Sequence, residues 1–590
     1  MKTAETASDQ PSRRFLSFAL GVIIFSWSAY ALATAGLFAR PVVLAVFGVF
    51  SIISSVLLIR FLLAASGTAR LATAAIIVFI AGLLIGTAPT IFSGRDQGSI
   101  ADAAAELSTT GSSTFSDSAV DTFFEIYGPG RALNFPGFFY GEDGFLRSQF
   151  PESYISWLAA FHSVFGIEGF VIGNGFLFFL TLLSIFMLVR ELSDDRSAVL
   201  AVILSGGSFL LPWFVKSTLS ENLGAFLFIF LSFSLVGFLR RPGTTGFVAV
   251  VLTATLLALT RIEGFAILAI AFGLLYLPVP SRRFLDSHGP LFRIAPFVFS
   301  ASAALSDFLP NISRYALIGK AFLHDVSAGE NLPVSTVLAD KTGTALELWR
   351  LLHSYGLFPI AILGFAGIAV LILRRNRTAL VPALLAAPTF LYLLDPNITG
   401  DHPWMLRRLA FSVWPALIVS ATVALREIIP DRPTTRFLPS AAVACLLFFS
   451  LPPTLRTFAF SENRDLLAET ARLAESVGSE DLVLVDREAT GDPFAIPSGP
   501  LRFLFGKKAA YCFNPDDIAK IPSGRYRHLY LLVTEDSLGR WSEVIRNAAP
   551  VATFRFHTER LGPSPLSDPA FPEISERTVE STLIRIDPTI

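Results

Sequence analysis

Long apolar runs separated by short polar clusters dominate the chain between Phe15 and Leu451. Each run is close to the roughly 20 residues that an α-helix needs to cross about 30 Å of hydrocarbon. Length and hydropathy therefore predict an α-helical polytopic membrane protein with about thirteen spans. These spans lie near residues 15–36, 41–64, 69–92, 169–189, 197–215, 219–239, 244–260, 263–280, 291–309, 352–373, 378–395, 406–426 and 437–455.

The composition agrees with this pattern, because 53% of the 590 residues are hydrophobic and 16% are charged. A soluble domain carries about 25% charged residues, so we expect most of the chain to have membrane lipids as neighbours. The net charge of -1 gives no reason to expect nucleic acid as a partner. Cys445 lies in an apolar run and Cys512 in a polar segment, which argues against a disulfide framework or a cysteine metal site.

The first apolar run follows Arg13 and Arg14, as in a signal anchor that starts in the cytoplasm. Residues 31–33 (Ala-Leu-Ala) resemble a cleavage site, so a removed signal peptide is the alternative. The run is long for a signal peptide, which favours the anchor.

Alternate connections between the spans carry the arginines that the positive-inside rule places in the cytoplasm. They are Arg60, Arg70, Arg190, Arg196, Arg240, Arg241, Arg282, Arg283, Arg374, Arg375, Arg377, Arg426, Arg432 and Arg436. Counting 152–166 as a span would turn the later ones outward, so we expect this segment to be an in-plane or re-entrant helix on the outer surface.

This orientation predicts a cell-membrane protein with a cytoplasmic N-terminus and two parts. Residues 1–455 form the transmembrane domain, with a first large outer loop at 93–168 and a second at 310–351. Residues 456–590 have the composition of a soluble extracytoplasmic domain. Strand-like runs at 482–485, 528–533 and 582–586 between helix-like segments at 464–477 and 537–547 predict a small α/β fold. It has no glycine-rich phosphate loop, which favours a structural or acceptor-binding role.

Asp96 lies in a Gly-flanked segment, residues 94–98, at the mouth of the third predicted span. Ile100, Ala103, Ala104 and Leu107 follow at helical spacing, which predicts a surface helix. The simple interpretation of Asp96 is a carboxylate at a helix N-terminus, where the helix dipole favours it. The functional interpretation depends on the other outer segments.

Glu221, Arg261 and Glu263 lie at the outer edges of otherwise apolar spans. Ionisable groups inside hydrocarbon cost roughly 2.5–3.5 kcal/mol on insertion scales, so they tend to face a cavity or pair. The alternatives are interfacial snorkelling or a structural Arg–Glu pair.

Arg407 and Arg408 depart from the charge rule, because they begin a span on its outer side. Guanidinium groups suit phosphate oxygens, so this pair is a candidate phosphate site. The alternative is that the pair neutralises Asp395 and Asp401. His402 by itself is typical of an ordinary loop histidine.

The first outer loop holds further ionisable residues, including Glu142, Asp143 and Arg147. One of its acids is a candidate partner of Asp96 or ligand of a divalent metal, and most are expected to be solvated. No metal-ligand spacing assigns a metal site, so the sequence assigns no cofactor and leaves a divalent metal open.

Taken in order, these segments resemble the GT-C fold glycosyltransferases, which include aminoarabinose and protein O-mannosyl transferases and use polyprenyl-phosphate sugars. An acid opening the first outer loop before a helix ending near Thr-Gly matches residues 94–111. The helix along the outer membrane surface is similar to residues 150–166, and residues 219–221, 259–264 and the Arg407–Arg408 pair also look like family features. The resemblance covers roughly residues 70–430.

The resemblance implies an inverting transfer of a sugar from a polyprenyl-phosphate donor to an extracytoplasmic lipid, cell-envelope glycan or protein. Asp96 would be the catalytic base, and Arg407, Arg408, Arg261 and Arg147 would bind the donor phosphate. Glu221, Glu263 and His402 would be polar residues of the cavity.

The chain departs from the family pattern at three points. Two extra spans precede the first outer loop, and residues 147–151 replace the usual Lys-Pro-Pro-like start of the surface helix. The second acid of some members has only Glu142 and Asp143 as candidates.

A transporter or flippase of a lipid-linked or small substrate is the main alternative function, and a noncatalytic scaffold is another.

Overall fold

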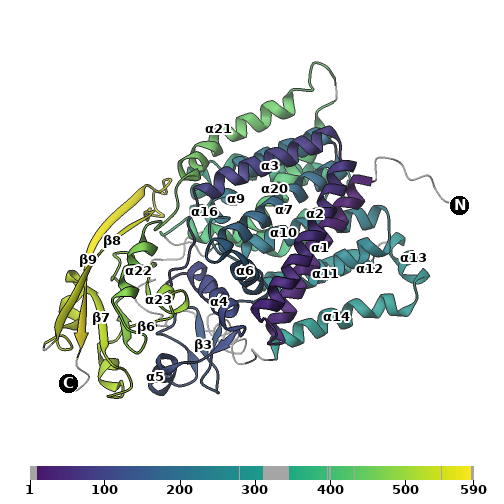
Figure 1. Cartoon of the computed structure of the whole chain (residues 1–590). Helices are drawn as coiled ribbons and strands as arrows, with labels where there is room; N and C mark the ends of the chain where they lie inside the picture. The colour runs from purple at the N-terminus through teal and green to yellow at the C-terminus, as the bar shows by residue number, and fades with distance from the viewer. Residues whose placement is uncertain are drawn as a thin grey trace.

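A computed structural model describes residues 10–277, 279–309, 312, 345–394, 396, 400–430, 432–546 and 548–586. Most of the predicted second outer loop, 310–351, lies outside these residues, as does Asp395. Figure 1 shows a bundle of helices with a mixed sheet from the C-terminal part at one end.

Seven helices are long and apolar enough to cross a membrane among the described residues. They are α1 Gln10–Thr34, α2 Arg40–Ala64, α3 Gly67–Ile85, α7 Glu168–Leu192, α10 Glu221–Arg240, α14 Pro290–Phe308 and α21 Leu438–Phe458.

Three bent helix pairs raise this number to ten if each pair is one span. The bends are 77° between α12 and α13, 115° between α16 and α17, and 50° at the short break before α20. The bounds are α12 Glu263–Tyr276, α13 Val279–Ser287, α16 Ala345–Ser354, α17 Phe358–Leu373, η3 Trp404–Leu406, α19 Arg407–Ala410 and α20 Val413–Ile428.

The remaining predicted spans are shorter or broken elements. They are α8 Asp195–Gly207, α9 Leu210–Phe214, α11 Thr244–Thr260, α18 Val381–Leu385 and the 3₁₀ helix η2 Ala387–Leu393. Pro382 and Pro388 begin the last two, and proline removes a backbone donor from a helix. A multi-pass membrane protein is therefore supported, while the count of about thirteen spans stays a prediction.

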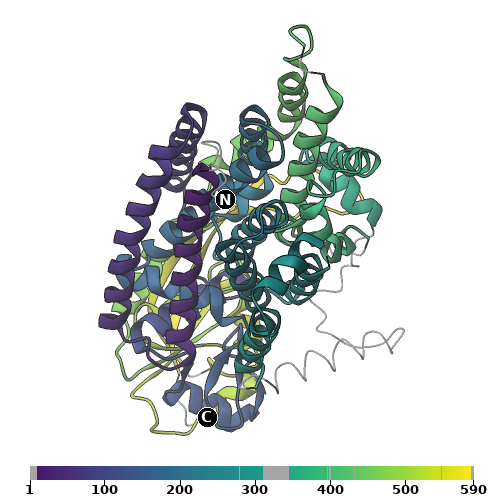
Figure 2. The same cartoon turned by 90° about the vertical axis from the view of Figure 1, so that its right-hand side faces the viewer.

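Burial separates the central helices from the lipid-facing ones. In the most apolar window of α7 and of α10, 89% of residues are buried, whereas the figure for α2 is 17%. Leu63, Leu71 and Ile85 on the outer helices are at least 72% exposed. Large apolar side chains that face outward along a whole helix are expected where hydrocarbon is the solvent. Figure 2 shows α1 and α2 along one flank of the bundle.

Residues 93–168, which are predicted to be the first outer loop and are called the first outer segment below, fold into helices around a small antiparallel sheet of order β1-β4-β3-β2. Its elements are α4 Asp96–Thr110, β1 Thr114–Phe115, α5 Ser118–Tyr127, β2 Gly130–Arg131, β3 Phe138–Tyr140, β4 Leu146–Ser148 and α6 Glu152–Phe165. α6 is the segment predicted to lie in plane. Its 14 residues reach about 21 Å, which is short for a crossing.

The C-terminal part forms a five-stranded sheet of order β6-β5-β7-β9-β8. β6, β5 and β7 are parallel, whereas β9 and β8 are antiparallel additions. The elements are α22 Leu466–Glu475, β5 Leu482–Val485, α23 Ser498–Phe503, β6 Lys508–Tyr511, η4 Pro515–Lys520, β7 Leu529–Thr534, η5 Glu535–Trp541, β8 Ala549–Leu561 and β9 Ile574–Ile586. The predicted strands fall on β5, β7 and β9, and that residues 456–590 are a separate extracytoplasmic domain stays a prediction.

The C-terminal part packs directly against the first outer segment. The backbone N–H of Tyr511 donates to the carbonyl of Asn134 at 3.0 Å, and Asn134 Nδ2 donates back to the Tyr511 carbonyl at 2.7 Å. Arg525 and Glu125 form an ion pair at 2.6 Å. This packing places α23 of the C-terminal part beside α4, the helix that begins at Asp96 (Figure 1).

Candidate active site

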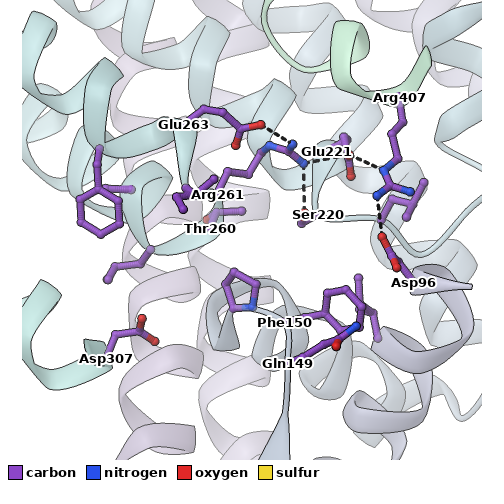
Figure 3. A pocket seen from close by; sticks show the side chains of 17 residues that line it. Asp96, Gln149, Phe150, Ser220, Glu221, Thr260, Arg261, Glu263, Asp307 and Arg407 are labelled. Atoms are coloured by element: carbon purple, nitrogen blue, oxygen red, sulfur yellow. Dashed lines mark hydrogen bonds and ion pairs between the residues drawn. The ribbon is translucent and has the colours of Figure 1, made fainter. Parts of the chain in front are cut away.

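A cavity of about 330 Å³ lies between the first outer segment, residues 93–168, and the adjacent ends of several helices. Its walls come from the start of α4, the residues leading into α6, the starts of α10 and α12, and α14. Figure 3 shows the polar side chains that line it. The fold thus brings together residues that are more than 300 positions apart, as Asp96 and Arg407 are.

Asp96 is the first residue of α4, where the partial positive charge of the helix terminus favours a carboxylate. Its Oδ2 accepts a hydrogen bond from Arg407 Nη2 at 2.5 Å. The Asp96 side chain is 34% exposed, so part of the carboxylate faces the cavity.

The Asp96–Arg407 pair continues into a chain of alternating charges. Arg407 Nε lies 3.2 Å from Glu221 Oε1, and Arg261 Nη1 lies 2.9 Å from the same oxygen. Arg261 Nη2 donates to Glu263 Oε1 at 2.9 Å, and that oxygen also accepts from the Tyr392 hydroxyl at 2.6 Å. Partners on both sides compensate the desolvation of these buried charges, as their positions in apolar helices require.

Aromatic rings stack on the guanidinium groups of Arg407 and Arg261. The Arg407 guanidinium lies 4.1 Å from the Trp404 ring centroid, and that of Arg261 lies 4.4 Å from Phe411. Such stacking fixes the guanidinium plane without using its N–H groups. Arg407 Nη1 is buried and has no hydrogen-bond partner among the described residues, so a donor is left over for an anionic ligand.

The position of Asp96 is fixed by the C-terminal part. Ser93 and Ile496 exchange two backbone hydrogen bonds, of 3.2 and 2.8 Å. Gly94 has a φ of +117°, and a Cβ there would lie 3.0 Å from the backbone of Phe494. Arg95 stacks on the Phe494 ring at 4.1 Å. Residues 494–496 therefore clamp the three residues that precede the acid.

Residues of the loop before Arg407 also hold the segment of Asp96 in place. Arg95 pairs with Asp401 at 3.0 Å, and its guanidinium lies 5.3 Å from the Trp404 ring. Trp404 thus contacts Arg95, the neighbour of Asp96, as well as Arg407. The sequence singles out the segments that hold Asp96 and Arg407, but no sequence pattern indicates that Trp404 contacts both of them.

Five of the predicted residues line the cavity, namely Asp96, Glu221, Arg261, Glu263 and Arg407. Arg408 does not line it; its guanidinium donates to the Pro396 carbonyl at 3.2 Å and lies 5.5 Å from the Tyr392 ring. The direction of a helix explains the difference, since adjacent residues project about 100° apart.

Glu142, Asp143 and Arg147 do not line the cavity. Asp143 and Arg147 pair with each other at 2.5 Å beside the β3–β4 turn. The Arg147 guanidinium lowers the pKa of Asp143 below its usual range. Arg147 already has a carboxylate partner there, so the pair takes no part in the mechanism proposed below.

His402 is fully buried and also lies outside the cavity lining. Its Nδ1 lies 2.8 Å from the Tyr355 hydroxyl. Burial lowers the pKa of His402 to about 4, which keeps the ring neutral at physiological pH. This environment is that of a packed structural histidine.

Several lining residues were missed from the sequence. Asp307, near the end of α14, faces the cavity on the side away from Asp96 (Figure 3). Gln149 and Phe150, just before α6, form the floor between them. Asp307 is an acidic residue near the end of an apolar span, and this position is the sequence feature that could have identified it. No group of three or more His, Cys, Asp or Glu residues that could hold a metal ion occurs in the part of the chain that the structure describes.

No family model matches the chain, and no curated protein does. Solved structures match most of it. ArnT from Cupriavidus metallidurans in the apo state aligns with a TM-score of 0.53 at 12% identity, covering 87% of this chain and 98% of that chain. The same protein bound to undecaprenyl phosphate aligns with a TM-score of 0.50 at 12% identity, covering 88% and 98%. The Archaeoglobus fulgidus oligosaccharyltransferase in the apo form aligns with a TM-score of 0.48 at 10% identity, covering 80% and 70%.

At these identities the alignments establish the fold. ArnT, an aminoarabinose transferase, is a GT-C fold glycosyltransferase and aligns over nearly its whole length. The chain therefore has the GT-C fold, as its resemblance to this family predicted.

Proposed function

We propose that the chain is a membrane glycosyltransferase that moves a sugar from a polyprenyl-phosphate donor to an extracytoplasmic acceptor. The observation that carries the proposal is the Asp96–Arg407 pair, in which an acid and a phosphate-suited cation face one cavity. The membrane is the cell membrane, with the N-terminus in the cytoplasm and the cavity on the opposite side.

The donor phosphate is bound by arginine. Arg407 has a buried Nη1 with no partner among the described residues, and Arg261 lines the same cavity. Bidentate, charge-assisted hydrogen bonds suit a phosphate that gains negative charge as it leaves. ArnT has been solved with undecaprenyl phosphate, which supports a lipid phosphate as the ligand of this fold.

The cavity also offers a route for the lipid chain. Ile262 and Phe265 line it and are 67% and 41% exposed. Exposed apolar side chains at the outer end of a membrane helix face lipid, so the phosphate enters the cavity while the prenyl chain stays in the bilayer.

Asp96 acts as the general base. The acceptor hydroxyl oxygen attacks the anomeric carbon, a new C–O bond forms, and the hydroxyl proton passes to the Asp96 carboxylate. The bond from that carbon to the phosphate oxygen breaks, and its electron pair leaves with polyprenyl phosphate. A single displacement inverts the configuration at the anomeric carbon. The acceptor is a lipid, a cell-envelope glycan or a protein.

The position of the charges favours this chemistry over transport. Glu221 and Glu263 are the first residues of α10 and α12, and Asp96 is the first of α4. Transporters of lipid-linked or small substrates place paired ionisable groups near the middle of the membrane, at broken helices. Charges at helix starts around one cavity suit a reaction at the membrane surface.

Glycan and lipid analysis of a strain that lacks the protein tests the function and identifies the product. Wild-type protein restores the missing sugar modification, Asp96→Asn does not, and Asp143→Asn restores it because Asp143 lies outside the cavity. Restoration by Asp96→Asn at the wild-type level would remove Asp96 from the mechanism. Loss of a lipid-linked intermediate from one leaflet, with no product missing, would favour a flippase.

A further inference from the structure

A second cavity, of about 460 Å³, lies at the opposite end of α10 from the Asp96 site. Glu221 begins α10 and lines the first cavity, while Gly237 and Arg241 near its end line the second. The 20 residues of α10 span about 30 Å, the thickness of the hydrocarbon core. Figure 1 shows the start of α1, which also lines this cavity, at the end of the bundle away from the sheet. The two cavities thus face opposite leaflets.

Basic and hydroxyl groups line the second cavity. Arg13 and Arg241 contribute guanidinium groups, and Thr244 and Thr245 begin α11. Gly243 gives α11 no side-chain cap, and residues 243–246 at the start of this helix line the cavity. Exposed N–H groups at a helix start bind phosphate, and the adjacent arginines add charge.

The balance of charge around this cavity is positive. Glu191 is the acid that lines it, and it pairs with Arg241 at 2.5 Å and accepts a hydrogen bond from Ser12 at 3.1 Å. Arg240, just outside the lining, lies 3.6 Å from the same carboxylate. Arg240 and Arg241 therefore share one glutamate, and Arg13 adds a further guanidinium group to the cavity lining.

A buried hydroxyl points independently to a polar ligand. Ser234, which lines the cavity, is 2% exposed. Its Oγ has no hydrogen-bond partner among the described residues. A helical serine usually bonds to the carbonyl four residues earlier, as Ser232 does at 2.9 Å, so an unsatisfied hydroxyl here calls for a ligand or water.

We propose that this cavity binds the phosphate headgroup of an anionic phospholipid in the leaflet opposite the Asp96 site. Leu16, Phe233 and Phe238 form its apolar wall, where acyl chains pack, while the arginines and the start of α11 contact the headgroup. Basic pockets between helices on the cytoplasmic side are the expected place for such lipids.

Lipid binding to the purified full-length protein in detergent, measured by native mass spectrometry, tests the proposal. We compare phosphatidylglycerol with phosphatidylcholine. The double variant Arg13→Gln/Arg241→Gln lowers the affinity for phosphatidylglycerol about thirtyfold. Arg374→Gln, an exposed arginine outside the cavity, leaves it unchanged.

A cavity-filling variant separates binding from folding. Gly237 lines the cavity and a Cβ there would meet nothing within 4 Å, so Gly237→Leu is chosen to reduce the cavity while keeping every charge. We expect it to weaken phosphatidylglycerol binding about as strongly as the double variant, with an unchanged melting temperature. Wild-type affinity in both variants would overturn the proposal. Inorganic phosphate that binds as tightly as phosphatidylglycerol would assign the site to free phosphate and overturn the lipid.

Discussion

In the proposed mechanism, the side chains of the Asp96 cavity divide into those that contact the substrate and those that position other side chains. Asp96 and Arg407 face the cavity directly, whereas Trp404 and Asp401 hold Arg407 and Arg95. Glu221 is 4% exposed between two arginines, so it sets their positions and offsets their charge. A chain of pairs fixes each guanidinium before substrate arrives, which is the condition for electrostatic stabilisation of a leaving phosphate.

Replacement of Arg407 and of Arg408, one at a time, tests which of these two neighbouring arginines binds the donor phosphate. Arg407→Gln lowers the affinity for undecaprenyl phosphate about tenfold or more, because charge-assisted hydrogen bonds contribute roughly 1.5–3 kcal/mol. Arg408→Gln is the matched control, since Arg408 lies outside the cavity lining. Equal losses in the two variants, measured by binding to purified protein, would contradict the assignment.

His402 gives the protein a pH dependence that is unrelated to the reaction. Its pKa in the folded protein is about 4, below the ordinary 6.5, because burial disfavours the charged ring; Asp401 partly opposes this effect. A lowered pKa stabilises the fold above pH 6.5, and this contribution of up to about 3 kcal/mol is lost as the pH falls towards 4. His402→Gln therefore has a smaller drop in melting temperature between pH 7 and pH 5 than the wild type.

The half-buried His162 provides the comparison for this pH effect. Burial lowers its pKa to about 4 as well, so its contribution persists in His402→Gln and the pH dependence is reduced without disappearing. Identical pH profiles for the wild type and His402→Gln would contradict a buried neutral His402.

At the scale of elements, α4 carries the acid and the C-terminal part positions α4. Ser93 Oγ donates to Asp102 Oδ2 at 2.8 Å, and α23 packs against both through Gly499. A Cβ at Gly499 would lie 2.2 Å from Ser93 Oγ and 2.4 Å from Asp102 Oδ2. Contact with α23 of the C-terminal part therefore fixes the position of α4 relative to the membrane helices.

Gly499→Ala tests this coupling. The added methyl group displaces Ser93, three residues before Asp96, and such overpacking costs about 1–3 kcal/mol. We expect lower sugar transfer with a modest fall in melting temperature. Gly539→Ala is the control, because a Cβ there would meet nothing within 4 Å. Full activity in a folded Gly499→Ala protein would show that the contact does not position Asp96.

The sequence predicted most of the helical elements for physical reasons that are local, and it singled out Asp96, which the structure places in the lining of the cavity. Long apolar runs specify α1, α2, α7 and α10, because hydrocarbon thickness fixes their length. The 115° bend before α17 and the sheet partners β6 and β8 depend on tertiary packing, which hydropathy does not encode. The same holds for Trp404 and Asp307, whose places in the site depend on segments distant in sequence.

In the whole molecule, the two cavities and the charged residues that line them lie at opposite ends of the helix bundle. The acid site and the sheet lie at one end, and the start of α1 lies at the other (Figure 1). The distribution of arginines in the sequence predicts that the sheet end is extracytoplasmic. Donor lipid, acceptor and catalytic acid then meet on one side of the membrane.

Cysteine labelling in intact cells checks this orientation. Cys512 is buried and Cys445 lies on the apolar helix α21, so both are replaced by serine. Glu576→Cys, exposed on β9, reacts with a membrane-impermeant thiol reagent in intact cells. Ser287→Cys, exposed at the opposite end, reacts only after lysis. The reverse pattern would overturn the predicted topology.

In the proposed mechanism, Asp96 takes the proton of the acceptor in a transfer from polyprenyl phosphate. Single-turnover transfer by purified protein, with the donor and acceptor identified from the deletion strain, tests it most directly. Asp96→Asn should slow transfer by about 10²–10⁴-fold while donor binding and melting temperature stay close to wild type, and Asp143→Asn should match the wild type. Transfer by Asp96→Asn at the wild-type rate would rule out Asp96 as the general base.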